Sequence, residues 1–445
     1  MDIAIMIAQL ILSLSILVIL HELGHFIPAK LFGTRVEKFY LFFDPWFSLF
    51  KVKRGGTEYG IGWLPLGGYV KIAGMVDESM DKEFKNRAPQ PWEFRSKKAW
   101  QRLIIMIGGV TVNFLLGFFI FGMMLFVYGE NKLPTSEMKY GVGTTTLSRN
   151  AGFMDGDVIV ALDGQEMKYF NGSVIAKEIM LDKLRKVTVV RNGSTMEIII
   201  PESAASAISS QQKEAIGMLS VRFPTKVAKV DPNSPGGKAG LKENDQIVNI
   251  NGENTPYFSD LSEKLKDNKN KIITLGVIRA GKEVELTNIQ LNDKGTIGFN
   301  PTAPEKFFKM EKQDYSLLEA LPAGVNKGVS FLSDQISAFG QMFTGDIKAS
   351  ESLGGFASIT KLFPTTWDWE QFWRITGILS LILAFMNLLP IPALDGGYIM
   401  FLLWEVITGR KVNDKVMEVA TTAGMILLLG LLLYAIGLDI FRALK

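Results

Sequence analysis

The pentapeptide His21-Glu22-Leu23-Gly24-His25 contains both histidines of the chain, at the end of an apolar run that begins at Ile3. Residues four apart lie on one face of a helix, so both imidazoles can reach one metal ion, with Glu22 beside the attacking water. Two ordinary histidines in a buried helix are the alternative. Because a bilayer makes Glu and His costly to bury, the position of the motif favours metal binding.

The composition fits a membrane protein with a soluble part, since 47% of the 445 residues are hydrophobic while 21% are charged. The net charge of +3 gives no argument for nucleic acid, and we expect no nucleic-acid partner. Cysteine is absent, so a metal must be held by His, Asp, Glu or water. Asp2 is the only early charge and no small-residue cleavage site follows, so we expect the first apolar helix to be retained.

Four apolar stretches are each close to the roughly 20 residues that a helix needs to cross a bilayer: 3–25, 103–128, 372–389 and 419–440. A buried soluble helix is the alternative for any one of them, but the four together favour a membrane protein. Loops rich in Lys and Arg precede the second stretch and follow the third, and we expect both loops to be cytoplasmic. Both termini and residues 129–370 are then extracytoplasmic, with the histidine motif toward the cytoplasmic side.

An internal repeat occupies the predicted outer region. Residues 151–164, with Ala151-Gly152-Phe153 and then Asp157 to Gly164, are echoed 88 residues later at 239–252. A period this long predicts tandem domains, each with a glycine turn, a short strand, a helical stretch and a further strand pair. After them, apolar residues recur every three or four positions and predict an amphipathic helix, which lies on the outer leaflet, screens the approach to the membrane core or packs on the neighbouring domain. These residues are Leu321, Val325, Val329, Leu332, Ile336, Phe339 and Phe343.

Glycines and aromatic residues alternate between Thr57 and Ile72, which predicts a β-hairpin in this range. Its apolar content suggests that it lies against the membrane, and a plain cytoplasmic hairpin is the alternative. Non-helical backbone at membrane depth must be covered by protein or by a wet cavity.

Two histidines leave a zinc site one protein ligand short, and without another histidine that ligand must be a carboxylate. Glu37 and Glu58 are candidates because they are near in sequence. Asp395 is a better one, because the predicted topology brings it and the histidine pair to a similar depth. The prolines and glycines around Asp395 break the helix there, which is tolerable if the break lines a cavity; a helix end capped by Asp is the alternative.

Two amides complete the set of candidate residues. Asn387 could hold the substrate backbone or the oxyanion, or could serve only as a hydrogen bond between helices. Asn113 is a polar residue within the second apolar stretch, near Gly109 and Gly117, and for that segment we favour helix packing.

Together these residues resemble the site-2 protease family of intramembrane zinc metalloproteases, and within it the bacterial RseP type with two outward PDZ domains. His21-Glu22-x-x-His25 resembles the family's zinc motif. Asn387-x-x-Pro390-x-Pro392-x-Leu394-Asp395-Gly396 resembles its second motif, whose Asp is the third ligand. The resemblance implies one Zn²⁺ held by His21, His25 and Asp395, with Glu22 as the catalytic base. It also implies that Gly67, Gly68, Tyr69, Asn387, Pro390 and Pro392 bind substrate.

The fold implied is a multi-domain membrane protein with a four-helix transmembrane core, a membrane-associated β-hairpin and two extracytoplasmic PDZ-like α+β domains. The expected segments are 1–128 with the zinc motif and hairpin, 129–215 and 216–305 as the PDZ-like domains, 306–365 as a helical linker, and 366–445 with the second motif. The activity implied is hydrolysis of peptide bonds within the transmembrane segments of single-pass proteins, such as anti-sigma factors and remnant signal peptides, in a bacterial inner membrane. The expected partners are these substrates, the lipid bilayer and peptide ligands of the PDZ-like domains.

Two other functions compete with this reading. One is a catalytically inactive PDZ membrane scaffold, which would not need a base such as Glu22 between two metal ligands. The other is a metal transporter, which is expected to show inverted repeats and further ligands within its helices, and the sequence shows neither.

Overall fold

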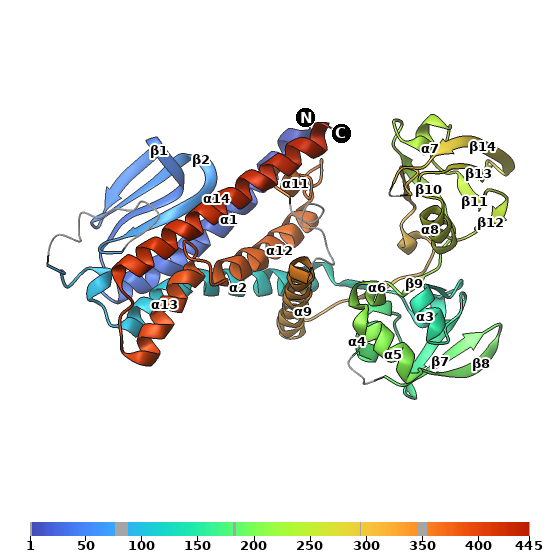
Figure 1. Cartoon of the computed structure of the whole chain (residues 1–445), viewed down its shortest axis with the longest axis horizontal. Helices are drawn as coiled ribbons and strands as arrows, with labels where there is room; N and C mark the ends of the chain where they lie inside the picture. Colours follow the sequence, from blue (N-terminus) through green and yellow to red (C-terminus); the bar gives the residue numbers. More distant parts are fainter. Residues whose placement is uncertain (1, 76–87, 181–183, 294, 345–353, 445) are drawn as a thin grey trace. The chain divides into compact units, whose positions relative to one another are not determined.

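The computed structural model describes residues 2–75, 88–180, 184–293, 295–344 and 354–444 (Figure 1). The chain forms two compact units, which are described separately. Met1–Gly129 and Asp314–Lys445 form the first, here called the membrane unit, and Glu130–Gln313 form the second, here called the repeat unit.

Among the described residues, four helices of the membrane unit are long and apolar enough to cross a bilayer. They are α1 (Asp2–Leu31), α2 (Ala99–Tyr128), α12 (Trp369–Leu388) and α14 (Asp414–Leu444). Both α1 and α12 pack against α2. A shorter helix, α13 (Asp395–Thr408), follows α12 and also contacts α2. The sequence did not predict it, because its 14 residues are too few to register as a span.

The predicted amphipathic helix is α9 (Leu317–Thr344), and it packs along α2. A β-carbon on Gly324 would lie 2.2 Å from the backbone nitrogen of Gly122, so the two helices touch at a pair of glycines. The face of α9 that packs on α2 carries Ala320, Gly324 and Gly328, whereas Val325, Val329 and Ile336 of the predicted apolar face are exposed. The short helix α11 (Phe356–Thr360) lies beside α14, whose Asp439 accepts hydrogen bonds from the first turn of α11.

The hairpin is larger than predicted. Strands β1 (Val36–Arg54) and β2 (Thr57–Ile72) pair antiparallel, so the range expected to hold a whole hairpin forms only its second strand. The turn is Gly55-Gly56, and both glycines have a positive φ that a two-residue hairpin turn favours. The strands lie beside α1 (Figure 1).

The repeat unit contains two four-stranded sheets with the same strand order. The first has the order β6-β5-β7-β8 and the second the order β12-β11-β13-β14. One helix accompanies each sheet, α4 (Gly172–Met180) in the first copy and α8 (Phe258–Asp267) in the second. The strands of the first sheet are β5 (Val158–Leu162), β6 (Gln165–Glu166), β7 (Lys186–Arg191) and β8 (Ser194–Ile199). Those of the second are β11 (Gln246–Ile250), β12 (Glu253–Asn254), β13 (Ile272–Arg279) and β14 (Lys282–Gln290).

A buried ion pair is repeated in the two copies and shows that they share one construction. Arg191 donates two hydrogen bonds to Asp157, of 2.7 and 2.8 Å, and a third to the backbone of the glycine turn. Arg279 and Asp245 form the same arrangement, with bonds of 2.7 and 2.6 Å. Each copy also has its own apolar core.

Three further strand pairs complete the repeat unit. Strands β3 (Glu130–Lys132) and β16 (Glu311–Gln313) pair where the chain enters and leaves the unit. Strand β4 (Val142–Thr144) pairs with β9 (Leu219–Val221), and β10 (Val227–Val230) pairs with β15 (Phe299–Pro301). The short helices are α3 (Thr146–Asn150), α5 (Glu202–Ser210), α6 (Gln212–Ile216) and α7 (Pro235–Lys238).

Candidate metal centre

The histidine pair of α1 and the first residue of α13 meet in the membrane unit. Asp395 Oδ2 lies 3.2 Å from His21 Nε2 and 3.3 Å from His25 Nε2. The two Nε2 atoms are 3.3 Å apart. Within the part of the chain that the structure describes, these three residues are the only group of His and acidic side chains gathered closely enough to hold an ion.

The three residues fit a divalent cation on chemical grounds. Asp395 Oδ2 is buried, and the polar atoms that the structure places beside it are the Nε2 atoms of the two imidazoles. Leaving a buried carboxylate oxygen without a partner is costly, and a cation between it and two imidazole nitrogens removes that cost. Two His and one carboxylate are a ligand set that zinc accepts in catalytic sites, where a fourth position stays open.

The nearer carboxylates are engaged elsewhere. Glu37 lies 3.7 Å from Lys71 in an ion pair of the hairpin. Glu58 accepts a hydrogen bond of 2.7 Å from the hydroxyl of Tyr40. Neither belongs to the group formed by the histidines, whereas Asp395 does.

Glycines bring α2 against the two imidazoles. A β-carbon on Gly109 would lie 2.3 Å from His25 Nε2 and 2.7 Å from His21 Cε1, so no larger residue fits there unchanged. One residue earlier, a β-carbon on Gly108 would lie 1.9 Å from the backbone oxygen of Gly24, which shows how closely α1 and α2 cross. The close approach predicted for Gly109 thus forms the wall of the candidate metal centre.

Each imidazole has a partner at its second nitrogen. His25 Nδ1 lies 2.8 Å from the backbone oxygen of Ile105, and since a carbonyl only accepts, Nδ1 carries the proton and Nε2 is bare. His21 Nδ1 lies 3.0 Å from Asn113 Nδ2. Sequence reasoning gave Asn113 a packing role only; its spacing of four residues from Gly109 was the signal that it shares the face turned toward α1.

Glu22 lies between the histidines in sequence and beside the hairpin in space. Its carboxylate faces the backbone N–H of Val70 in β2. A β-carbon on Gly68 would lie 2.5 Å from Val18 and 3.6 Å from Glu22 Cγ, so a glycine lets β2 approach α1 at this point. The hairpin therefore positions the candidate base.

Of the residues predicted to bind substrate, Gly67 and Gly68 lie on the part of β2 near Glu22, whereas the side chain of Tyr69 belongs to the hairpin itself. Tyr69 donates a hydrogen bond of 2.9 Å to Asp44. Burial, followed by this bond, raises the pKa of the Tyr69 hydroxyl above its ordinary value. We therefore expect the backbone around Tyr69, rather than its ring, to meet a substrate.

The second motif forms a tight bend between α12 and α13. Ala393 has a φ of +83°, a left-handed conformation that non-glycine residues rarely adopt and that is typical of functional sites. The bend is close-packed, since a β-carbon on Gly424 of α14 would overlap the backbone oxygen of Pro392. Pro390 is exposed, and Asn387, in the last turn of α12, makes no side-chain hydrogen bond to the described residues. The alternative role of Asn387 as a bond between helices therefore has no support among these residues.

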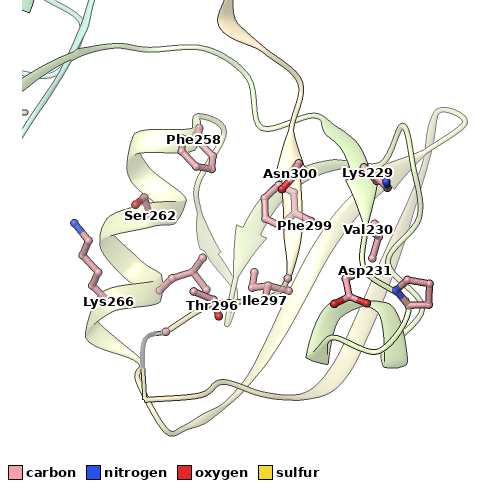
Figure 2. Close-up of a pocket in the computed structure, with 14 residues that line it drawn as sticks. Lys229, Val230, Asp231, Phe258, Ser262, Lys266, Thr296, Ile297, Phe299 and Asn300 are labelled. Atoms are coloured by element: carbon pink, nitrogen blue, oxygen red, sulfur yellow. The ribbon is translucent and has the colours of Figure 1, made fainter. Parts of the chain in front are cut away.

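The repeat unit offers a second candidate site, a cavity of about 790 Å³ in its second copy. Figure 2 shows it between α8, which carries Ser262 and Lys266, and the stretch of chain that passes Ile297 and enters β15 at Phe299. In the first copy the helix lies closer to the equivalent strand, since a β-carbon on Gly172 of α4 would lie 2.1 Å from the backbone oxygen of Leu219 in β9. The two copies thus differ at the place where an extended ligand could enter.

The comparisons with known proteins agree with this geometry. The chain belongs to peptidase family M50, whose model matches residues 9–431. It is 28% identical to the "Regulator of sigma-E protease RseP" of Escherichia coli, over 98% of both chains. It is 29% identical to a protein of Vibrio cholerae named "Putative zinc metalloprotease", over 97% of both, and 26% identical to the "Regulator of sigma E protease" of Haemophilus influenzae, over 97% of this chain and 98% of that one.

The family match confirms the resemblance seen in the sequence. The chain is a membrane metalloprotease of the site-2 protease family, similar to RseP. Its apolar helices and these relatives support a place in the inner membrane, and the names of the relatives imply zinc as the metal. The transporter and scaffold alternatives are not favoured.

Proposed function

We propose that the chain cuts peptide bonds within the transmembrane segments of single-pass membrane proteins, using His21, His25 and Asp395 as ligands of one zinc ion and Glu22 as the base. The observation that carries this is the buried meeting of both histidines with a carboxylate almost four hundred residues away in sequence. When bound, zinc supplies a Lewis acid that polarises a carbonyl and makes water a stronger acid.

The residues of the chain supply the other steps. Glu22 accepts a proton from the attacking water and later gives it to the leaving amine. Its carboxylate faces the N–H of Val70, so the base lies beside the strand that we propose presents the substrate. The free amide of Asn387 donates a hydrogen bond to the substrate backbone or to the oxyanion.

The hairpin presents the substrate as an added strand. The first half of β2 pairs with β1 along both edges, whereas residues 68–72 pair with β1 along one edge only and leave the other edge without a partner in the sheet. Gly68 lies on this part of β2 beside Val18 and Glu22 of α1, so a substrate strand added to the unpaired edge would run close to the base. An extended conformation also exposes a peptide bond, which a helical transmembrane segment keeps within its own hydrogen bonds. We propose anti-sigma factors and remnant signal peptides as substrates, by analogy with the names of the relatives and the family.

The cleavage experiment uses the full chain in detergent with a tagged single-span substrate. We expect cleavage by the wild type, a loss of at least about 100-fold in Glu22→Gln with zinc retained, and inhibition by a chelator. Glu37→Gln is the matched control, because it removes a carboxylate of the hairpin that lies outside the metal centre. Cleavage that survives Glu22→Gln would refute the assigned base.

The same preparation separates the competing functions. A scaffold predicts peptide binding without cleavage in the wild type. A transporter predicts zinc uptake by vesicles that contain the protein. We further propose that both termini and the repeat unit are extracytoplasmic, which protease protection of spheroplasts tests.

We also propose that the cavity of the second copy takes an extended peptide end, as a PDZ-like groove does. β15 is paired by β10 along one edge, and the cavity lies between it and α8. Lys229 and Lys266 at its rim favour a carboxylate. A peptide with a free carboxyl end should bind the full chain more tightly than its amidated form, and Lys266→Glu should remove the difference. Equal binding of the two peptides would contradict this assignment.

A further inference from the structure

Asn113 lies fully buried on α2, with its two side-chain polar atoms in different situations. Nδ2 is 3.0 Å from His21 Nδ1, whereas Oδ1 is buried without a hydrogen-bond partner. An amide buried against an imidazole with its oxygen unused is costly, so the arrangement calls for an explanation. Packing between helices does not explain the contact with the ring.

The ring nitrogen of His21 that carries the proton decides whether Oδ1 or Nδ2 of Asn113 can form a hydrogen bond with His21 Nδ1. In the arrangement that the structure shows, Nδ2 donates to a bare Nδ1, so the ring proton is on Nε2, which faces Asp395 Oδ2 at 3.2 Å. A nitrogen that carries a proton cannot hold a metal. When Nε2 coordinates, the proton is on Nδ1 instead, and an amide N–H facing it would oppose donor with donor.

Turning the amide of Asn113 by half a turn resolves this conflict. The turn exchanges Oδ1 and Nδ2 and places the unused oxygen at Nδ1, where it accepts the Nδ1 proton. The ring loses a proton at Nε2 and gains one at Nδ1, so its charge does not change. His25 needs no such change, because the backbone oxygen of Ile105 accepts from its Nδ1 in both states.

We infer that Asn113 is a positioning residue that selects the metal-binding tautomer of His21 by the orientation of its amide. This inference rests on the metal centre of the proposed function and adds a role that neither the ligand set nor the base requires. Partners of this kind fix ring orientation and raise the basicity of the ligand, and losing one typically lowers metal affinity about 10- to 100-fold.

Three variants separate this role from packing. Asn113→Leu keeps the volume and has no acceptor, so we expect zinc affinity in a chelator competition to fall about 10- to 100-fold. Asn113→Asp has only acceptors at this position. We therefore expect its zinc affinity to be no more than about threefold below that of the wild type. Thr111→Val is the matched control: its hydroxyl bonds within α2 to Ile107, and its affinity should not change.

A spectroscopic readout does not depend on cleavage. The chain has only two histidines, so a preparation labelled with [¹⁵N]histidine and purified through a histidine-free tag shows only two rings. Without metal, one ring should carry its proton on Nε2 and the other on Nδ1. With zinc, both should carry it on Nδ1. If Asn113→Leu fails to accumulate, the wild-type spectra alone decide.

The outcomes distinguish this inference from the proposed function. If His25→Ala binds zinc as the wild type does, the metal centre itself is wrong. If His25→Ala loses zinc but Asn113→Leu binds like the wild type, only the role of Asn113 is wrong. The role of Asn113 is also overturned if His21 binds zinc through Nδ1. The same holds if Asn113→Asp binds zinc as weakly as Asn113→Leu.

Discussion

Replacing Gly109 by alanine should empty the metal centre while leaving the helix intact. The added methyl carbon would lie 2.3 Å from His25 Nε2 and 2.7 Å from His21 Cε1. Both contacts involve the ligand rings themselves, so relief requires moving a ring or separating α1 from α2. Separating α1 from α2 is costly, because it would lose the close packing of Gly108 against the backbone of Gly24.

The size of the effect follows from the distance. An ordinary contact of a methyl carbon begins near 3.4 Å, so His25 must move by about 1 Å. A displacement of about 1 Å in a catalytic group costs on the order of 100-fold in rate, and a metal site tolerates only about 0.5 Å. We therefore expect the cleavage rate to fall at least about 100-fold and the zinc affinity to fall by a similar factor. Overpacking of this kind lowers stability by about 1–3 kcal/mol, which leaves the chain folded.

The assay compares zinc content, chelator competition and cleavage for Gly109→Ala and Gly430→Ala. Gly430 is the matched control because it lies in α14 and a β-carbon there would meet nothing within 4 Å. The control should retain wild-type values and gain a little helix stability. Full zinc occupancy and wild-type cleavage in Gly109→Ala would refute the view that α2 forms the wall of the site.

Three further predictions concern other contacts. Burial acts to raise the pKa of Asp245, but hydrogen bonds from Arg279 hold that pKa below its ordinary value. A lowered pKa stabilises the fold above the unfolded value of about 4 and loses that effect as the pH falls through the folded value, so the wild-type melting temperature should fall more steeply below pH 4 than that of Asp245→Asn. Arg102 donates to Glu405 at 2.6 Å in a mostly buried pair, so Glu405→Ala should cost about 3 kcal/mol in denaturant unfolding, and an apolar replacement of both residues should cost less. In Gly68→Ala the added carbon should push β2 away from the catalytic base and lower cleavage at least about 10-fold, with zinc content unchanged.

Features that depend on local spacing could be predicted from the sequence. The helical period places His21 and His25 on one face, and the structure shows their Nε2 atoms 3.3 Å apart. The echo at 88 residues predicts two copies, and the structure repeats the strand order and the Arg–Asp pair. The shared helical face can be predicted from the spacing of nearby residues, and the two copies can be predicted from the similarity of two segments.

Features that depend on turns and on contacts between distant segments were harder to predict. The hairpin range was wrong because the turn is Gly55-Gly56, which lies just before the predicted range, so the first strand precedes that range. The helix α13 was missed because a short apolar helix beside a bend has no signature of its own. The contact between α9 and α2 depends on Gly324 meeting Gly122, a pairing that neither segment reveals alone.

The face of α2 turned toward the histidines explains why one carboxylate near the other end of the chain completes the site. Ile105, Gly109 and Asn113 are spaced by four residues and therefore share a face. Because α1 and α2 run antiparallel, Ile105 meets His25, Asn113 meets His21, and Gly109 lies against both. This face orients both rings but offers no anionic ligand, so the charge that binds the cation must come from another segment. α13 begins at Asp395 and packs on α2, which holds the carboxylate at the open side of the pair. The ligand set is thus split between one helix that carries the rings, one that orients them and one that supplies the charge.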